Sequence, residues 1–457
     1  MLDEELVDHF ISLVEPTDFG DIRLGVSEGT TIEVNSGQVR SVSGYESAGF
    51  GVRVRHKGVW GFASSSRLTK EAVGDAVEKA YKIVHSAPKP SEDVDFRVNP
   101  SREKLGYPWR TDPRGVEIDE KLGVAMRADR AAKLQDVYST QTTYQDSVTE
   151  WLVGNTSGTL VHFYASYPRL ICSAFVKDEF ATQSVMQSLD ANCGFELFDG
   201  DAPERVGGRA GEKAVRLLGA RAVKAGIYDV VLDSAMTGVY THEAFGHASE
   251  ADLVIAGTSV LEDKLGRKVG SEVVNIVDDP TIQGVRGSFP FDQEGTRAKK
   301  RNIVEAGVLK SYLHTLETAA RFRVEPNGAA RAMDFSSKPI ARMSNTFIVP
   351  GEHKEELYED IKLGVMFSGF QYGYVDPGSG KFMFKAQYGQ MIRNGELEEY
   401  VRDAALAGFT LDVLSKIDAV GSNLSFEGGT CGKNGQWVPC STGGPHVRVR
   451  GVVVGGQ

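Results

Sequence analysis

The sequence predicts an α+β fold of two domains, with mostly antiparallel sheets and packed helices in both. Three observations support this class. The chain has 457 residues, more than one ordinary hydrophobic core accommodates. Apolar and polar residues alternate in runs bounded by Gly- and Ser-containing turns, which is typical of strands that pair through hairpins. Between these runs lie segments with apolar residues at helical spacing, which indicate amphipathic helices.

The first half is predicted to alternate between such helices and strands. Apolar residues at helical spacing predict a helix over 3–14. Residues 30–43 alternate around a Ser-Gly turn, and residues 49–64 predict a hairpin that turns at Lys57-Gly58. The elements that follow are a helix capped by Thr69 that runs to about 86, a Pro-rich loop over 86–96, a helix over 116–134, an antiparallel meander over 136–185 with a turn at Asn155 to Gly158, and a helix over about 203–221.

The second half starts with a change of pattern near residue 222. "YDVVLD" at 228–233 predicts a buried strand, and a helix with two histidines follows it. We therefore expect an N-terminal domain over 1–221 and a C-terminal domain over 222–457. Near the end, residues 404–421 predict one helix with neighbouring turns, and residues 446–456 predict a strand.

Composition excludes several classes of function. The net charge of −11 lacks the electrostatic footprint of a nucleic-acid binder, so no direct nucleic-acid partner is expected. No positively charged start precedes an apolar core as in a secretory signal, and no window reaches the roughly 18 apolar residues needed to span a membrane. Four scattered cysteines do not form a disulfide framework, so we expect a reducing cytoplasmic location.

The segment "SAMTGVYTHEAFGHASEADL" at 234–253 contains His242, Glu243 and His247 with the spacing H-E-x-x-x-H. Residues five apart on a regular helix differ by about 140°, too far to share one metal ion. A single π-helical turn, with i→i+5 hydrogen bonds, restores the alignment. Gly246 lies inside the interval, where glycine relaxes the backbone at little cost. The spacing therefore predicts a metal site only on a locally widened helix.

Two histidines do not complete a catalytic zinc site, which generally has three protein ligands and one open position. Residue type and spacing leave four candidates for the third ligand: Cys431, Cys440, Glu250 and Asp252. Glu243 lies beside the first histidine, and a carboxylate is a common general base for a metal-activated water. Iron or manganese would use similar ligands, so the sequence leaves the metal open.

The H-E-x-x-x-H segment is followed, about 180 residues later, by Gly429-Thr430-Cys431, and this pair of motifs resembles the TldD branch of the TldD/PmbA family. Members of this family are metallopeptidases that were historically called modulators of DNA gyrase. Further matching segments are "FPFDQEGTRAKKRNIVEAGVLKSYL" (289–313), "SNTFIVPG" (344–351), "GYVDPGSGKFMF" (373–384) and "CGKNGQWVP" (431–439). One departure is Gln293, where the family often has a second Asp.

The resemblance implies one zinc ion per subunit, with His242, His247 and Cys431 as ligands and Glu243 as the general base. It places Glu250 behind the ligands instead of among them. It further implies short or unfolded polypeptides as substrates. The implied partner is a TldE- or PmbA-like subunit, with a homodimer as the alternative.

Three functions remain open at this point. The first is a zinc-dependent metallopeptidase, and the second is a non-enzymatic regulatory or chaperone-like binding protein with a structural metal. The third is a metal-dependent hydrolase of a non-peptide amide. Closed structural zinc sites normally have four protein ligands, whereas three are convincing here, which favours an open catalytic site.

Overall fold

The computed structural model describes residues 2–16, 18–88, 98–179, 181–353 and 356–456. The loop predicted over 86–96 lies largely outside these residues. Helices and mainly antiparallel sheets are combined throughout, which confirms the predicted α+β class. Within the described ranges, no helix is long and apolar enough to cross a membrane.

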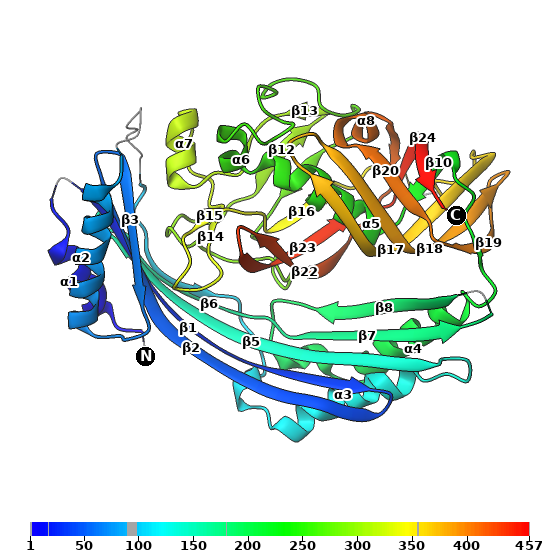
Figure 1. Ribbon diagram of the computed structural model, residues 1–457, viewed down its shortest axis with the longest axis horizontal. Helices are drawn as coiled ribbons and strands as arrows, with labels where there is room; N and C mark the ends of the chain where they lie inside the picture. The colour runs from blue at the N-terminus through cyan, green and yellow to red at the C-terminus, as the bar shows by residue number, and fades with distance from the viewer. Residues whose placement is uncertain (1, 17, 89–97, 180, 354–355, 457) are drawn as a thin grey trace.

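A long curved sheet dominates the N-terminal half (Figure 1). Its strands follow the order β3-β2-β1-β5-β6-β4, while β7 pairs with both β5 and β8. Neighbouring strands are antiparallel, apart from the parallel pair β4 and β6. The strands are β1 (Phe19–Asn35), β2 (Gln38–His56), β3 (Val59–Ser65), β4 (Arg102–Gly106), β5 (Ser139–Asn155), β6 (Leu160–Ser166), β7 (Arg169–Lys177) and β8 (Thr182–Asp190). The predicted hairpin and Asn155–Gly158 turn are confirmed. Residues 136–185 form antiparallel strands as predicted, but their order is not that of a meander, because β6 and β7 pair with different parts of β5.

Helices cover this sheet. They are α1 (Glu4–Leu13), α2 (Lys70–Ser86), α3 (Ile118–Ala132) and α4 (Ala202–Val215), with short 3₁₀ turns η1 (Pro113–Gly115) and η2 (Phe195–Phe198). Thr69 caps α2 as predicted, through a hydrogen bond from the Ala72 N–H. The α3 and α4 helices lie on the convex side of the sheet (Figure 1). The two helices pack so closely that a Cβ at Gly207 of α4 would lie 1.9 Å from the Ala128 carbonyl oxygen of α3. Glycine at position 207 therefore permits this contact. The prediction that α4 continues to residue 221 was wrong, because Gly219 has a φ of +72° that no helix continues through.

A second sheet, with the order β17-β10-β24-β20-β18-β19-β9 and β21 beside β24, belongs to the C-terminal half. Its strands are β9 (Arg221–Ala222), β10 (Gly226–Leu232), β17 (Leu363–Asp376), β18 (Lys381–Arg393), β19 (Glu396–Arg402), β20 (Ala405–Phe409), β21 (Ile417–Val420) and β24 (Val447–Gly455). The strands predicted at 228–233 and 446–456 are therefore confirmed. The prediction of one helix over 404–421 was wrong. Only α8 (Thr410–Ser415) is helical, because β20 pairs with β18 and β24, and these tertiary contacts override local helix propensity.

A third sheet carries the edge on which the candidate site is built. Its order is β13-β12-β11-β16-β23-β22, so β22 lies at one edge. The strands are β11 (Ile276–Asp278), β12 (Arg301–Glu305), β13 (Val308–Leu309), β16 (Asn345–Ile348), β22 (Ser425–Lys433) and β23 (Gln436–Gly444); a separate pair is β14 (Ala330–Arg331) and β15 (Ile340–Ala341). The β22–β23 hairpin is the part of this sheet that faces the concave side of the N-terminal sheet (Figure 1).

The helical segment with the two histidines lies inside the core between the second and third sheets. It consists of α5 (Ser234–Val239), the π-helix η3 (Tyr240–Gly246), the 3₁₀ turn η4 (His247–Ser249) and α6 (Ala251–Ile255). Tyr240, Ala244 and Phe245 belong to the main hydrophobic cluster of this half and are fully buried. One further helix, α7 (Leu316–Phe322), lies toward the N-terminal helices (Figure 1). The site therefore stands on a segment that packing fixes on several sides.

Candidate metal centre

A π-helix allows the two histidines, five residues apart, to lie on the same side of the helix. The His247 N–H donates to the His242 carbonyl oxygen, an i→i+5 bond between the two residues themselves. The predicted widening is thus confirmed, and it returns the two imidazoles to one side of the helix. Gly246 leaves room for Met343 against this turn, because an added Cβ would lie 2.1 Å from Met343 Sδ and the methionine would have to move.

Hydroxyl groups bond the distorted segment to its surroundings. Thr410 Oγ1 donates to the Ala244 carbonyl at 3.0 Å, and Tyr240 Oη donates to the Thr410 carbonyl of α8 at 2.7 Å. Ser249 Oγ donates to the Gly246 carbonyl at 2.6 Å. At the start of the segment, Asp233 caps α5 by accepting from the Met236 N–H. These bonds hold the irregular segment in one conformation.

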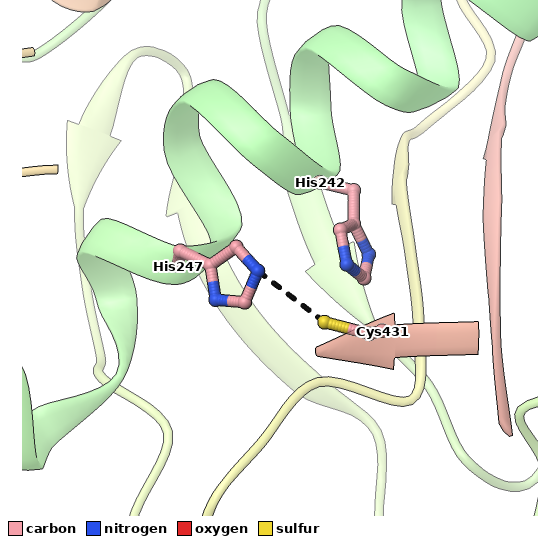
Figure 2. A group of neighbouring side chains, drawn as sticks. All are labelled: His242, His247 and Cys431. Carbon is pink, nitrogen blue, oxygen red and sulfur yellow. Dashed lines mark hydrogen bonds between the residues drawn. The ribbon is translucent and has the colours of Figure 1, made fainter. Parts of the chain in front are cut away.

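His242, His247 and Cys431 converge on one point (Figure 2). One ligand atom from each residue lies within 4.8 Å of the others. Cys431 Sγ is 3.3 Å from His247 Nε2, and the two imidazole rings meet edge-on at 84°. All three side chains are buried. The structure therefore brings together the three residues that the resemblance implied as ligands.

Cys431 reaches this point from β22, where it pairs with Val438 of β23. Arg342 fixes the hairpin from behind, since its Nη2 donates to the Cys431 carbonyl at 2.5 Å and its Nη1 donates to the Gln436 carbonyl at 3.3 Å. The Arg342 guanidinium is fully buried. These two hydrogen bonds to the backbone fix the position of the Cys431 thiol along β22.

Glu250 lies behind the ligands. Its Oε2 is 3.0 Å from His247 Nδ1, the ring nitrogen opposite the one that faces Cys431. Lys433 Nζ lies 3.0 Å from the same carboxylate and also contacts Asp252 at 2.7 Å. Glu250 and Asp252, two of the four candidate third ligands, are thus engaged away from the point of convergence. A metal-bound histidine commonly donates its second N–H to a carboxylate in this way.

Cys440, the remaining candidate, lies on the same hairpin as Cys431. It is buried and lies opposite Gly429 of β22. It is not part of the cluster of converging ligand atoms found among the described residues. Glu243, the predicted base, has a side chain that is 37 % exposed, and its Oε2 lies 3.7 Å from His247 Nε2. Glu243 is therefore the solvent-facing carboxylate of the site.

The electrostatics favour a thiolate beside the imidazoles. A hydrogen bond from Cys440 lowers the pKa of Cys431; burial opposes this, but the nearby His242 adds to the lowering, and the net pKa is well below the usual value. Burial lowers the pKa of His247, but Glu250 and Cys431 outweigh it and raise the net pKa well above normal. The site therefore concentrates negative charge around its rings, as a cation-binding site does.

The residues present fit a zinc ion. Two imidazoles and one thiolate are a donor set that zinc uses in catalytic sites, with a fourth position left open. His242 Nδ1 is buried and has no hydrogen-bond partner in the part of the chain that the structure describes. This buried ring atom is therefore left without a partner by the described residues, as expected of a ring that a cation would orient.

The loop with Gln293 has a structural role at its acidic positions. Asp292 accepts from the N–H groups of Glu294, Thr296 and Ala330. Gln293 Oε1 accepts from the Ala332 N–H.

Sequence reasoning missed the roles of Arg342 and Lys433, although the position of Lys433, two residues after Cys431, was a usable signal.

Most of the chain is similar to known proteins. Three segments match domains of one family: residues 20–84 match "PmbA/TldA metallopeptidase domain 1", residues 111–218 the central domain and residues 225–456 the C-terminal domain. The division predicted between residues 221 and 222 stays a prediction. A metalloprotease from Methanothermobacter thermautotrophicus is 39% identical over 98% of this chain and 97% of its own length. A zinc metalloprotease TldD homolog from Saccharolobus solfataricus is 28% identical over 89% of this chain and 90% of its own.

Two solved structures have the same architecture. A proposed modulator of a DNA gyrase from Thermotoga maritima is 26% identical, with a TM-score of 0.81 over 99% of this chain and all of its own. TldE from Thermococcus kodakarensis is 18% identical, with a TM-score of 0.79 over 99% of both chains. At 18% identity the second likeness concerns the fold alone.

Proposed function

Because the chain belongs to the PmbA/TldA metallopeptidase family, we propose that it hydrolyses peptide bonds with one zinc ion held by His242, His247 and Cys431. The observation that carries the proposal is the convergence of these three ligand atoms within 4.8 Å. Three protein donors leave one position for water, as in catalytic zinc sites. The name of the Saccharolobus solfataricus relative, a zinc metalloprotease, supports the choice of metal.

When bound, zinc supplies Lewis acidity that lowers the pKa of a water molecule and polarises the substrate carbonyl. The protein supplies the proton transfers. Glu243 has the most exposed carboxylate of the site and lies next to His247, so it accepts the proton of the attacking water and later donates it to the leaving amine. Glu250 accepts the Nδ1–H of His247, which leaves the lone pair of Nε2 free to face the point where the three ligand atoms converge.

The proposed substrates are short or unfolded polypeptides. Cys431 lies on β22, an edge strand of its sheet. The Gly428 carbonyl of this strand already accepts from Arg169 Nη2 at 3.1 Å, so the proposed pairing uses the edge from Gly429 to Lys433. An extended peptide that adds to this edge gains main-chain hydrogen bonds without readout of its side chains. Most segments of a folded protein already have their backbone groups paired, so this mode of binding would favour unfolded chains.

A dimer is the proposed assembly, either with a TldE- or PmbA-like partner or with a second copy. The fold shared with TldE supports pairing between chains of similar shape. The proposed compartment is the cytoplasm, and the four unpaired cysteines are consistent with a reducing environment.

The proposal is tested by Glu243→Gln, with zinc content and cleavage of an unfolded polypeptide measured on the same sample. We expect zinc to be retained and turnover to fall by about 10²–10⁴-fold, the usual contribution of a general base. Glu272→Gln is the matched control, because Glu272 is an exposed carboxylate that pairs with Lys268. Full turnover in Glu243→Gln would exclude this residue as the base. A zinc-loaded wild type that cleaves no peptide would favour a binding protein with a structural metal.

A further inference from the structure

A cavity of about 240 Å³ lies between the N-terminal sheet and the β22–β23 hairpin. Aromatic side chains from both halves form much of its wall: Tyr45, Trp151, Phe163, Tyr167, Phe289 and Trp437. The hydroxyl groups of Ser27 and Thr149 also line it and hydrogen-bond to each other at 3.0 Å. The volume and the walls suit a single bulky side chain.

The cavity lies against the hairpin that carries the candidate ligand Cys431. Thr430 and Val438 line it, and Cys431 follows the first in sequence and pairs with the second across the hairpin. Because successive side chains of a strand point to opposite faces, a group bound in the cavity contacts the residue next to Cys431 and not the thiol itself. A peptide paired with the β22 edge would pass this opening.

Arg331 is the one charged side chain among the described residues that line the cavity. It is 3 % exposed, and its guanidinium lies over the Phe289 ring, with Cζ 4.9 Å from the ring centroid. Nη1 donates to the Met343 carbonyl at 2.8 Å, whereas Nε has no hydrogen-bond partner within the described ranges. A buried cation with an unsatisfied donor is costly to maintain without an anion.

No carboxylate of the described residues forms an ion pair with Arg331. Asp278, which lies in the same half, is already engaged by Arg301 at 2.5 Å and by the Ser344 hydroxyl at 2.5 Å. Gln293 flanks Arg331 on both sides, since its N–H donates to the Ala330 carbonyl and its Oε1 accepts from the Ala332 N–H. This neutral amide adds no negative charge beside Arg331.

We propose that the cavity is a substrate subsite that accepts a carboxylate-bearing residue, with the carboxylate paired to Arg331 and the apolar part held by the aromatic wall. The inference rests on the proposed peptidase function. A planar guanidinium binds carboxylates in two-point geometry, which supplies the missing partner. The carboxylate comes from one of two sources, an acidic side chain or the free C-terminus of the peptide.

The inference is tested by calorimetric titration of the zinc-loaded protein with two matched pairs of probes. N-acetyl-phenylalanine and its amide report on a terminal carboxylate, while the amides of N-acetyl-glutamate and N-acetyl-glutamine report on a side chain. We expect the acid of at least one pair to bind at least about tenfold more tightly than its neutral analogue. Equal affinities in both pairs would overturn the inference.

Variants separate the cavity from the metal as the carboxylate-binding group. Gln293→Glu keeps the shape of the side chain but adds a negative charge beside Arg331, so the acid-to-neutral ratio is expected to fall to about one. Arg331→Gln is expected to do the same, and Arg297→Gln, at an exposed arginine paired with Glu103, is expected to keep the ratio. A ratio unchanged in Gln293→Glu would mean that the acid binds elsewhere, and would overturn the inference.

Cleavage assays on pairs of peptides, one with a free carboxylate and one with the corresponding amide at the same position, distinguish this inference from the proposed function. Cleavage without any preference for the acid would leave the peptidase intact and remove the subsite. An acid preference in binding without any cleavage would retain the carboxylate site and remove the peptidase function.

Discussion

The most informative perturbation of the candidate centre is Glu250→Gln. Glu250 is fully buried, and its Oε2 lies 3.0 Å from both His247 Nδ1 and Lys433 Nζ. The substitution keeps the shape of the side chain and an oxygen that accepts the His247 N–H, so the change is one of charge. A hydrogen bond to a charged acceptor contributes about 1.5–3 kcal/mol, against about 0.5–1.5 kcal/mol for a neutral one. The difference, on the order of 1–2 kcal/mol, corresponds to roughly 5- to 30-fold weaker zinc binding.

The assay is competitive titration of zinc between the protein and a chromophoric chelator. Asp252→Asn is the matched control, because Asp252 contacts Lys433 at 2.7 Å but forms no hydrogen bond with His247. We expect the control to bind zinc as the wild type does. Unchanged affinity in Glu250→Gln, or an equal loss in both variants, would refute the assignment of Glu250 as the residue that orients His247.

Three further predictions concern stability. Gly246→Ala places a Cβ 2.1 Å from Met343 Sδ, so urea denaturation should show a loss of about 1–3 kcal/mol. The same substitution should cost less when it is made in a Met343→Ala background and compared with that parent, and an unaffected single variant would contradict the tight packing of the π-helix. Burial raises the pKa of Asp278, but the charge of Arg301 and hydrogen bonds from Ser344 and Thr346 outweigh it, so the net pKa is lowered. The ionised carboxylate therefore stabilises the fold above the unfolded-state pKa of about 3.9, and this contribution is lost as the pH falls toward the lower folded-state value. Urea titrations from pH 6 downward should show a weaker acid dependence in Asp278→Asn than in the wild type, and equal slopes would contradict the shift. Zinc at 1,000 times its Kd should stabilise the wild type by about 4 kcal/mol, measured as a chelator-sensitive shift in Tm; we expect Cys440→Ser to keep this shift and Cys431→Ser to lose most of it, and the reverse pattern would exchange the roles of the two cysteines.

Local features of the site were predictable because they depend on periodicity. The five-residue interval between His242 and His247 is incompatible with a regular helix, and the i→i+5 bond between these residues is the predicted solution. The position of Gly246 was a second local signal. The helix over 404–421 shows the limit of such reasoning, since pairing of β20 with β18 and β24 decided its structure.

Contacts over long separations were not predictable from the residues themselves. Cys431 meets His247 across 184 positions because the β22–β23 hairpin pairs with β16, and neither spacing nor composition selects it from the four candidate ligands. Its choice as a ligand came from the family resemblance. The clamp from Arg342 to the Cys431 carbonyl spans 89 positions and has no local pattern at all.

The most direct test of the proposed centre is X-ray absorption at the zinc edge of the zinc-loaded protein. We predict one zinc per chain with one sulfur at about 2.3 Å and nitrogen or oxygen ligands at about 2.0–2.1 Å. A spectrum without sulfur in the first coordination shell, or with two sulfur ligands, would contradict a centre built from His242, His247 and Cys431.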